Sequence, residues 1–143
     1  QTLANAMDVG DPSNFARILN LYSQNGALTP EATHHRITNL ISGATYSDKK
    51  IAETMRQCYC ETGYVLDPHG ACGYRALQEG LQEGEIGVFC ETAHPAKFKE
   101  KVDDILGIDI EIPDRLKAFM EGEKQSVEMS KDFADFKRYL MQQ

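Results

Sequence analysis

The chain has 143 residues, of which 41% are hydrophobic and 26% charged, so it fits one ordinary globular domain and not a disordered polymer. Its 15 basic and 22 acidic residues give a formal net charge of −7, so phosphate backbones would repel it and nucleic acid is not expected as a partner. No apolar run approaches the roughly 20 residues that span a bilayer, and no signal peptide opens the chain, so no membrane partner is expected either.

The chain begins at Gln1 and not at a methionine, which suggests a fragment or a processed protein. Its four cysteines are too few for a disulfide framework at this length, so we expect a reducing, cytoplasmic setting. Cys58 and Cys60 stand two apart in a predicted helix, where residues at about 100° intervals place them roughly 200° apart. They therefore suit buried thiols better than a shared zinc ion, and no metal site is predicted.

Helical signals dominate the sequence. Three helices are expected from a capping residue followed by apolar residues at helical spacing, and they begin at Asp11-Pro12 (about residues 12–23), Thr29-Pro30 and Ser47. Gly63 is expected to end the third of them. Towards the other end, we expect a short helix after Ile112-Pro113 and a last amphipathic helix with its N-cap at Ser130.

Between these segments the pattern changes to strand, turn and helix. Tyr64–Leu66 and Ile86–Cys90 are short apolar runs, each followed by a polar turn and a predicted helix, the second ending at Gly107; Ala6–Val9 is interpreted as a third strand. The expected fold is therefore α/β, a helix-rich partial domain with a small parallel sheet. Two or three strands are few for such a sheet, which suggests that others come from a longer chain.

Ligands of open parallel sheets bind beyond the carboxyl ends of the strands, which here are the turns 67–73 and 91–95. The small residues from Gly70 to Gly73 either wall a pocket or allow close packing of a helix on a sheet, and the sequence favours neither interpretation.

More specific chemical roles for the residues of these turns have less support from the sequence. Cys90 and His94 could form a nucleophile and a base, but a thiol buried in a strand would be inert. His69 and His94 lack a third zinc ligand. Lys97, with Lys99 and Lys101, suits a solvated helix face better than a Schiff base.

Four motifs stand in order along the chain: MDVGDPSNF at 7–15, ATYSD at 44–48, GYVLDPH at 63–69 and TAHPAKF at 92–98. Together they resemble the threonine synthase family over essentially the whole chain, but over only the C-terminal third of the enzyme. The resemblance implies a pyridoxal-phosphate enzyme of fold type II, related to the tryptophan synthase β-subunit. Such an enzyme converts O-phospho-L-homoserine and water to L-threonine and phosphate.

The resemblance also implies a division of the chain. Residues 1–108 would be the C-terminal part of the large, cofactor-binding domain, and 109–143 a C-terminal helical extension. The family's Schiff-base lysine and Gly-rich phosphate loop lie upstream of these residues. We therefore expect the isolated chain to be inactive, to hold no catalytic residue and to need the rest of its own chain as a partner. Exposed sheet edges would make it self-associate.

The family's cofactor-binding positions match Thr92, Gly10, His94 and His69. Thr92 matches the residue whose hydroxyl faces the pyridine nitrogen, which a hydroxyl can bond without fixing a proton there. Gly10 matches a backbone turn close to the ring, where a side chain would collide. His94 would shape the turn that holds Thr92, and His69 would lie at the start of the helix beside the ring.

Two alternatives stay open. The first is another fold-type-II enzyme, such as a threonine dehydratase or a phosphoserine-utilising lyase. The second is a non-catalytic binding module on the same scaffold. A lysine-bearing strand–helix motif and a Gly-rich loop encoded just before Gln1 would favour the enzyme, and a start codon at that point would favour the module.

Overall fold

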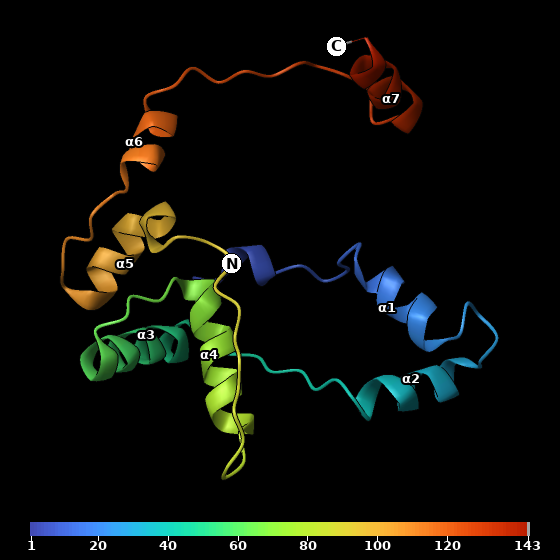
Figure 1. The fold of residues 1–143 in the computed structure, drawn as a ribbon, viewed down its shortest axis with the longest axis horizontal. Helices are drawn as coiled ribbons and strands as arrows, with labels where there is room; N and C mark the ends of the chain where they lie inside the picture. The colour runs from blue at the N-terminus through green and yellow to red at the C-terminus, as the bar shows by residue number, and fades with distance from the viewer. Residues whose placement is uncertain (143) are drawn as a thin grey trace. The chain divides into compact units, whose positions relative to one another are not determined.

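The structure is a computed structural model that describes residues 1–142, and helices are its only regular elements over that range (Figure 1). The helices are η1 (Asn5–Met7), α1 (Phe15–Tyr22), α2 (Pro30–Thr38), α3 (Asp48–Thr62), α4 (Pro68–Gly80), η2 (Pro95–Phe98), α5 (Lys99–Leu106), α6 (Asp114–Met120) and α7 (Phe133–Met141). Contacts divide the chain into one unit, Gln1–Glu111, and a second that begins at Ile112. Every helix within residues 1–142 is too short or too polar to span a bilayer.

Several helix boundaries follow from local chemistry, as predicted. The side chains of Thr29 and Asp67 accept hydrogen bonds from the first turns of α2 and α4, each of which has proline at its start. Gly63 and Gly107 end α3 and α5 in the left-handed conformation, with φ of 73° and 68°.

Two predicted helix starts are wrong by a few residues. α1 begins at Phe15 and not at residue 12, because the chain first turns and the Phe15 N–H donates to the carbonyl of Pro12 at 2.9 Å. The N-cap of α7 is Asp132 and not Ser130. The Ser130 hydroxyl instead donates to the carboxylate of Asp135.

The core of the first unit lies where α3 packs against α4 and α5. Ile51, Met55 and Cys58 are at most 3% exposed, and their spacing of four and three residues puts them on one face of α3. Leu66, from the segment between α3 and α4, and Val102 of α5 are fully buried with them. The apolar face expected on the third helix is thus confirmed.

The small parallel sheet is not formed by the residues that the structure describes, although the helix-rich character is as expected. Tyr64–Leu66 and Ile86–Cys90 have no regular structure, and Ala6–Val9 gives way to η1. A strand forms only when its N–H and C=O groups pair with a neighbouring strand. Residues 1–142 place no such partner beside these segments, so their apolar runs remain unpaired.

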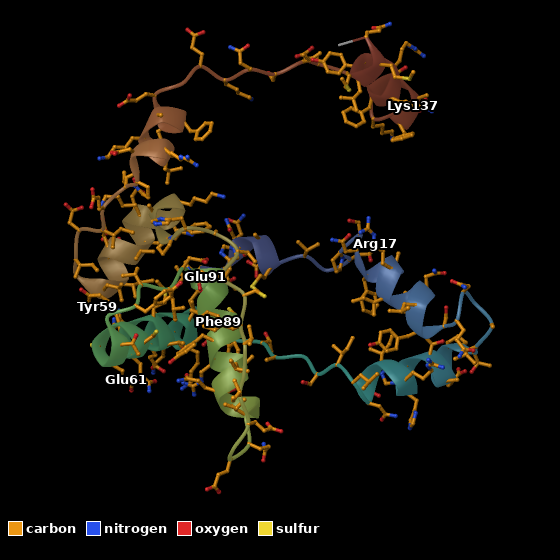
Figure 2. The ribbon with its side chains drawn as sticks, viewed as in Figure 1. Arg17, Tyr59, Glu61, Phe89, Glu91 and Lys137 are labelled. Atoms are coloured by element: carbon orange, nitrogen blue, oxygen red, sulfur yellow. The ribbon has the colours of Figure 1, made fainter. Side chains whose placement is uncertain are left out.

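The segment Ile86–Cys90 nevertheless keeps the two-sided pattern of a strand. Phe89 faces α4, where its ring lies 5.3 Å from that of Tyr74 in an edge-on arrangement (Figure 2). Ile86 and Val88, on the alternate positions, are 96% and 85% exposed. One side of the segment therefore packs on α4, and the other is an apolar face that no described residue covers.

We expect the 143-residue chain to self-associate through this apolar face, because an unpaired edge with exposed apolar side chains attracts a second chain. Sedimentation should show dimers or larger species, and the double variant Ile86→Lys/Val88→Lys should be monomeric. Leu40→Lys changes a residue that is 77% exposed elsewhere and serves as the matched control. A parent chain that stays monomeric at high concentration would contradict the prediction.

The second unit holds α6 and α7, and none of its described residues is buried. In α7, Phe133, Phe136 and Leu140 are spaced by three and four residues and form one exposed apolar face. The expected last amphipathic helix is confirmed.

Candidate functional site

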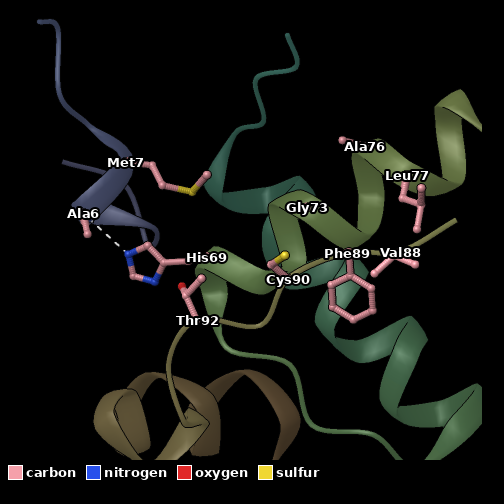
Figure 3. A pocket seen from close by; sticks show the side chains of 10 residues that line it. All are labelled: Ala6, Met7, His69, Gly73, Ala76, Leu77, Val88, Phe89, Cys90 and Thr92. Carbon is pink, nitrogen blue, oxygen red and sulfur yellow. Dashed lines mark hydrogen bonds between the residues drawn. The ribbon is translucent and has the colours of Figure 1, made fainter. Parts of the chain in front are cut away.

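The start of α4 joins several polar groups. Asp67 is fully buried, and its Oδ1 accepts hydrogen bonds from the backbone N–H of His69 at 2.8 Å and from the His69 ring Nδ1–H at 2.9 Å. The other ring nitrogen, Nε2, accepts from the backbone N–H of Ala6 at 3.2 Å, the dashed line in Figure 3. These contacts together require the neutral ring with its proton on Nδ1. His69 therefore ties the N-terminal segment to α4.

A cavity of about 640 Å³ opens beside this junction (Figure 3). It is lined by Ala6, Met7, His69, Gly73, Ala76, Leu77, Val88, Phe89, Cys90 and Thr92. The structure thus brings two of the predicted site residues, His69 and Thr92, to one cavity. Gly73 contributes to its wall, which favours the pocket interpretation of the small residues in the turn.

The other two predicted site residues do not line this cavity. A Cβ at Gly10 would meet no atom within 4 Å, so the described residues give no steric reason for glycine there. His94 caps η2, because its Nδ1 accepts from the backbone N–H of Ala96 at 3.1 Å. It lines a separate hollow together with Tyr64 and Ile110.

Glu91 is a polar residue of this junction that sequence reasoning did not single out. Its Oε1 accepts from the backbone N–H of Asp67 at 2.9 Å, which places it beside the start of α4 (Figure 2). Burial, and then the neighbouring Asp67 carboxyl, raise the pKa of Glu91 from 4.5 to about 7. The sequence signal for this contact is Gly70, since a Cβ there would overlap the Glu91 carboxyl.

The structure separates the other reactive groups considered from the sequence. Cys90 is exposed at the cavity and not buried, because its segment lacks the neighbouring strand that would cover it. His94 lies at the other hollow, so Cys90 and His94 do not share a site. Cys58 is buried and Cys60 exposed, which confirms that they point to opposite sides of α3. No cluster of three or more potential metal ligands occurs in residues 1–142.

Lys97 and Lys99, in and after η2, differ in their exposure and their contacts. Lys97 is exposed, as predicted. Lys99 is not part of a solvated face, because its Nζ donates to Asp103 at 2.7 Å, to the Ile110 carbonyl at 2.8 Å and also to Asp109. Lys99 therefore holds α5 to the chain that follows it.

This chain is similar in sequence to known threonine synthases. The family described as "Threonine synthase, C-terminal" matches residues 70–140. A threonine synthase from Serratia marcescens is 40% identical over 140 residues, which cover 98% of this chain and 30% of that protein. One from Haemophilus influenzae is also 40% identical, over 98% of this chain and 31% of its own length.

Two solved structures are similar to this chain. The crystal structure of threonine synthase from Escherichia coli is similar with a TM-score of 0.69 at 36% identity, covering 99% of this chain and 31% of that one. A pyridoxal-phosphate-bound threonine synthase from Brucella melitensis has a TM-score of 0.77 at 24% identity, covering 99% and 34%. The second likeness is one of fold alone. The chain spans about 30% of the length of the relatives that it matches.

Proposed function

Because this chain belongs to the threonine synthase family, as its four motifs predicted, we propose that it is the C-terminal part of a pyridoxal-phosphate enzyme. The whole enzyme would convert O-phospho-L-homoserine and water to L-threonine and phosphate. The observation that carries the proposal is the 40% identity to a threonine synthase along 98% of this chain. The cavity lined by His69 and Thr92 is a site where the cofactor of such an enzyme could bind.

The cavity fits part of pyridoxal phosphate. Gly73 and Ala76 of α4 leave room for a flat ring to approach the helix, and the exposed hydroxyl of Thr92 could bond a ring nitrogen. When bound, this cofactor stabilises carbanions of the substrate by withdrawing electrons. Among the described residues, neither lysine nor arginine lines the cavity. The amine for a Schiff base and the cations for the phosphate would therefore come from the rest of the enzyme.

The chain's own residues would bind and orient in this scheme. Thr92 would hold the ring nitrogen with its hydroxyl. His69 would fix the N-terminal segment against α4 through its bond to the Ala6 N–H. We also propose Gly10 and His94 as cofactor-binding residues. Neither lines the cavity, so their contacts with the cofactor would depend on parts of the enzyme outside this chain. Residues 1–108 would belong to the cofactor-binding domain and 109–143 to a helical extension.

The proposed partners are therefore O-phospho-L-homoserine and the remainder of the same polypeptide. The cytoplasm is the proposed compartment, because all four cysteines are free thiols and a reducing setting would keep them so.

The test is phosphate release from O-phospho-L-homoserine by the full-length gene product loaded with pyridoxal phosphate. We expect Thr92→Val to lower kcat/KM about tenfold, the effect of one lost hydrogen bond, and Thr92→Ser to restore most of it. A full-length protein that releases no phosphate, but deaminates threonine or binds ligands without turnover, would replace the proposal with one of the alternatives.

A further inference from the structure

We propose that Asp67 and Glu91 hold one proton between their carboxyl groups, and that this carboxyl pair positions Thr92 at the cavity. The part of the inference that concerns Thr92 rests on the proposed function. The shared proton itself rests only on the geometry of the junction.

Two buried oxygens lack a partner at this junction. Oδ2 of Asp67 and Oε2 of Glu91 are both inaccessible to solvent and accept no hydrogen bond. Their neighbours, Oδ1 and Oε1, are satisfied by N–H donors. A buried unsatisfied oxygen is costly, and a single proton between Oδ2 and Oε2 would satisfy both.

The surroundings place that proton on Glu91. Oδ1 of Asp67 already accepts from two N–H donors, the His69 backbone and ring, so Oδ2 is its remaining acceptor. Glu91 receives one donor, the backbone N–H of Asp67. Glu91 Oε2–H would therefore donate to Asp67 Oδ2, while Oε1 accepts in return from the same residue.

The neighbouring titratable groups do not supply a compensating cation. Those near Glu91 and Asp67 are Cys58 of α3, Tyr64 of the segment after α3, and His69, Cys72 and Tyr74 of α4. Asp8 of the N-terminal segment acts on His69 and Cys72 and is itself acidic. Within residues 1–142, Asp67 is the charged group that acts on the pKa of Glu91, and with burial it raises that pKa from 4.5 to about 7. Two neighbouring buried carboxyl groups cannot both ionise without a large cost in electrostatic free energy.

The pair joins the segments that line the cavity. Glu91 is the covalent neighbour of Thr92, so holding its carboxyl against Asp67 fixes where Thr92 lies. Asp67 also orients His69, which bonds the N–H of Ala6. Gly70 makes the contact possible, since a Cβ there would overlap Oε2 of Glu91. Loss of the proton would therefore loosen residues 91–94 from α4.

The direction of the pH dependence follows from the raised pKa. The stabilisation that the protonated pair gives is fully present below pH 4.5 and is lost as the pH rises through about 7. Above that pH, two buried negative charges repel each other and Glu91 would turn towards solvent.

The proton can be observed without cofactor or substrate. Infrared difference spectra between the full-length protein and its Glu91→Gln variant should show a protonated carboxyl band that persists at pH 6 and disappears with a midpoint near 7. Glu53→Gln is the control, because the hydrogen bond from Lys50 lowers the pKa of Glu53 and no such band is expected at pH 6. Absence of the Glu91 band at pH 6 would overturn the shared proton, whether or not the enzyme is a threonine synthase.

The positioning role has its own readout. Hydrogen exchange at the Asp67 amide, whose N–H donates to Oε1 of Glu91, should accelerate between pH 6 and pH 8 in the parent protein after correction for intrinsic rates. Glu91→Gln should stay protected at both pH values, because its amide can donate to Asp67 permanently. Gly70→Ala should lose the protection and the band at pH 6, whereas Gly80→Ala, with open space at the other end of α4, should keep both. Unchanged exchange in Gly70→Ala would overturn the positioning role.

Discussion

Replacing Leu66 by alanine is expected to lower the free energy of unfolding by about 2–5 kcal/mol, the usual range for removing a leucine from a filled core. Leu66 is completely buried and packs in the cluster that joins α3, α4 and α5. It also directly precedes Asp67, so a cavity at this position would loosen the junction at the start of α4. Chemical unfolding of the parent and variant proteins measures the difference.

The matched control is Leu40→Ala, which removes the same atoms from a side chain that is 77% exposed. That change should stay within about 0.5 kcal/mol of the parent, as surface substitutions usually do. Equal losses in the two variants would show that Leu66 is not part of a core.

Helix positions could be predicted from the sequence because their signals are local. Thr29 and Asp67 cap helices with side-chain atoms, and Gly63 and Gly107 end them because glycine adopts positive φ freely. The sheet could not be predicted in the same way. The run Ile86–Cys90 has the composition and the alternation of a strand, but the hydrogen bonds that make a strand belong to a partner that these 142 residues do not supply.

In the site, too, local features could be predicted from the sequence, whereas contacts between residues far apart in the chain could not. The turns that carry His69 and Thr92 were predicted from sequence, and the structure brings both to one cavity. Glu91 could not be predicted as a site residue, because its partner, Asp67, lies 24 residues away in the sequence. The contact also depends on residue 70 being glycine, since a Cβ there would overlap Glu91. The structure shows that Asp67 and Gly70 contact the turn that holds Glu91, whose carboxyl has a raised pKa there.

The second large effect concerns the isolated chain. We expect residues 1–143, mixed with pyridoxal phosphate and treated with borohydride, to show no stoichiometric label on any single lysine. The reason is structural: no lysine of the described residues lines the cavity, while Lys97 is exposed and Lys99 is bound to Asp103 and Asp109. Mass spectrometry of the peptides measures the labelling.

The full-length gene product is the positive control, and we expect its label on one lysine outside residues 1–143. Lys97→Arg in the isolated chain tests the lysine of the TAHPAKF motif, and it should change nothing, because an exposed lysine forms only weak, reversible imines with an aldehyde. One lysine of this chain labelled stoichiometrically, with the label abolished by its replacement with arginine, would contradict the prediction. It would also mean that the amine which anchors the cofactor lies within these residues and not in the rest of the enzyme.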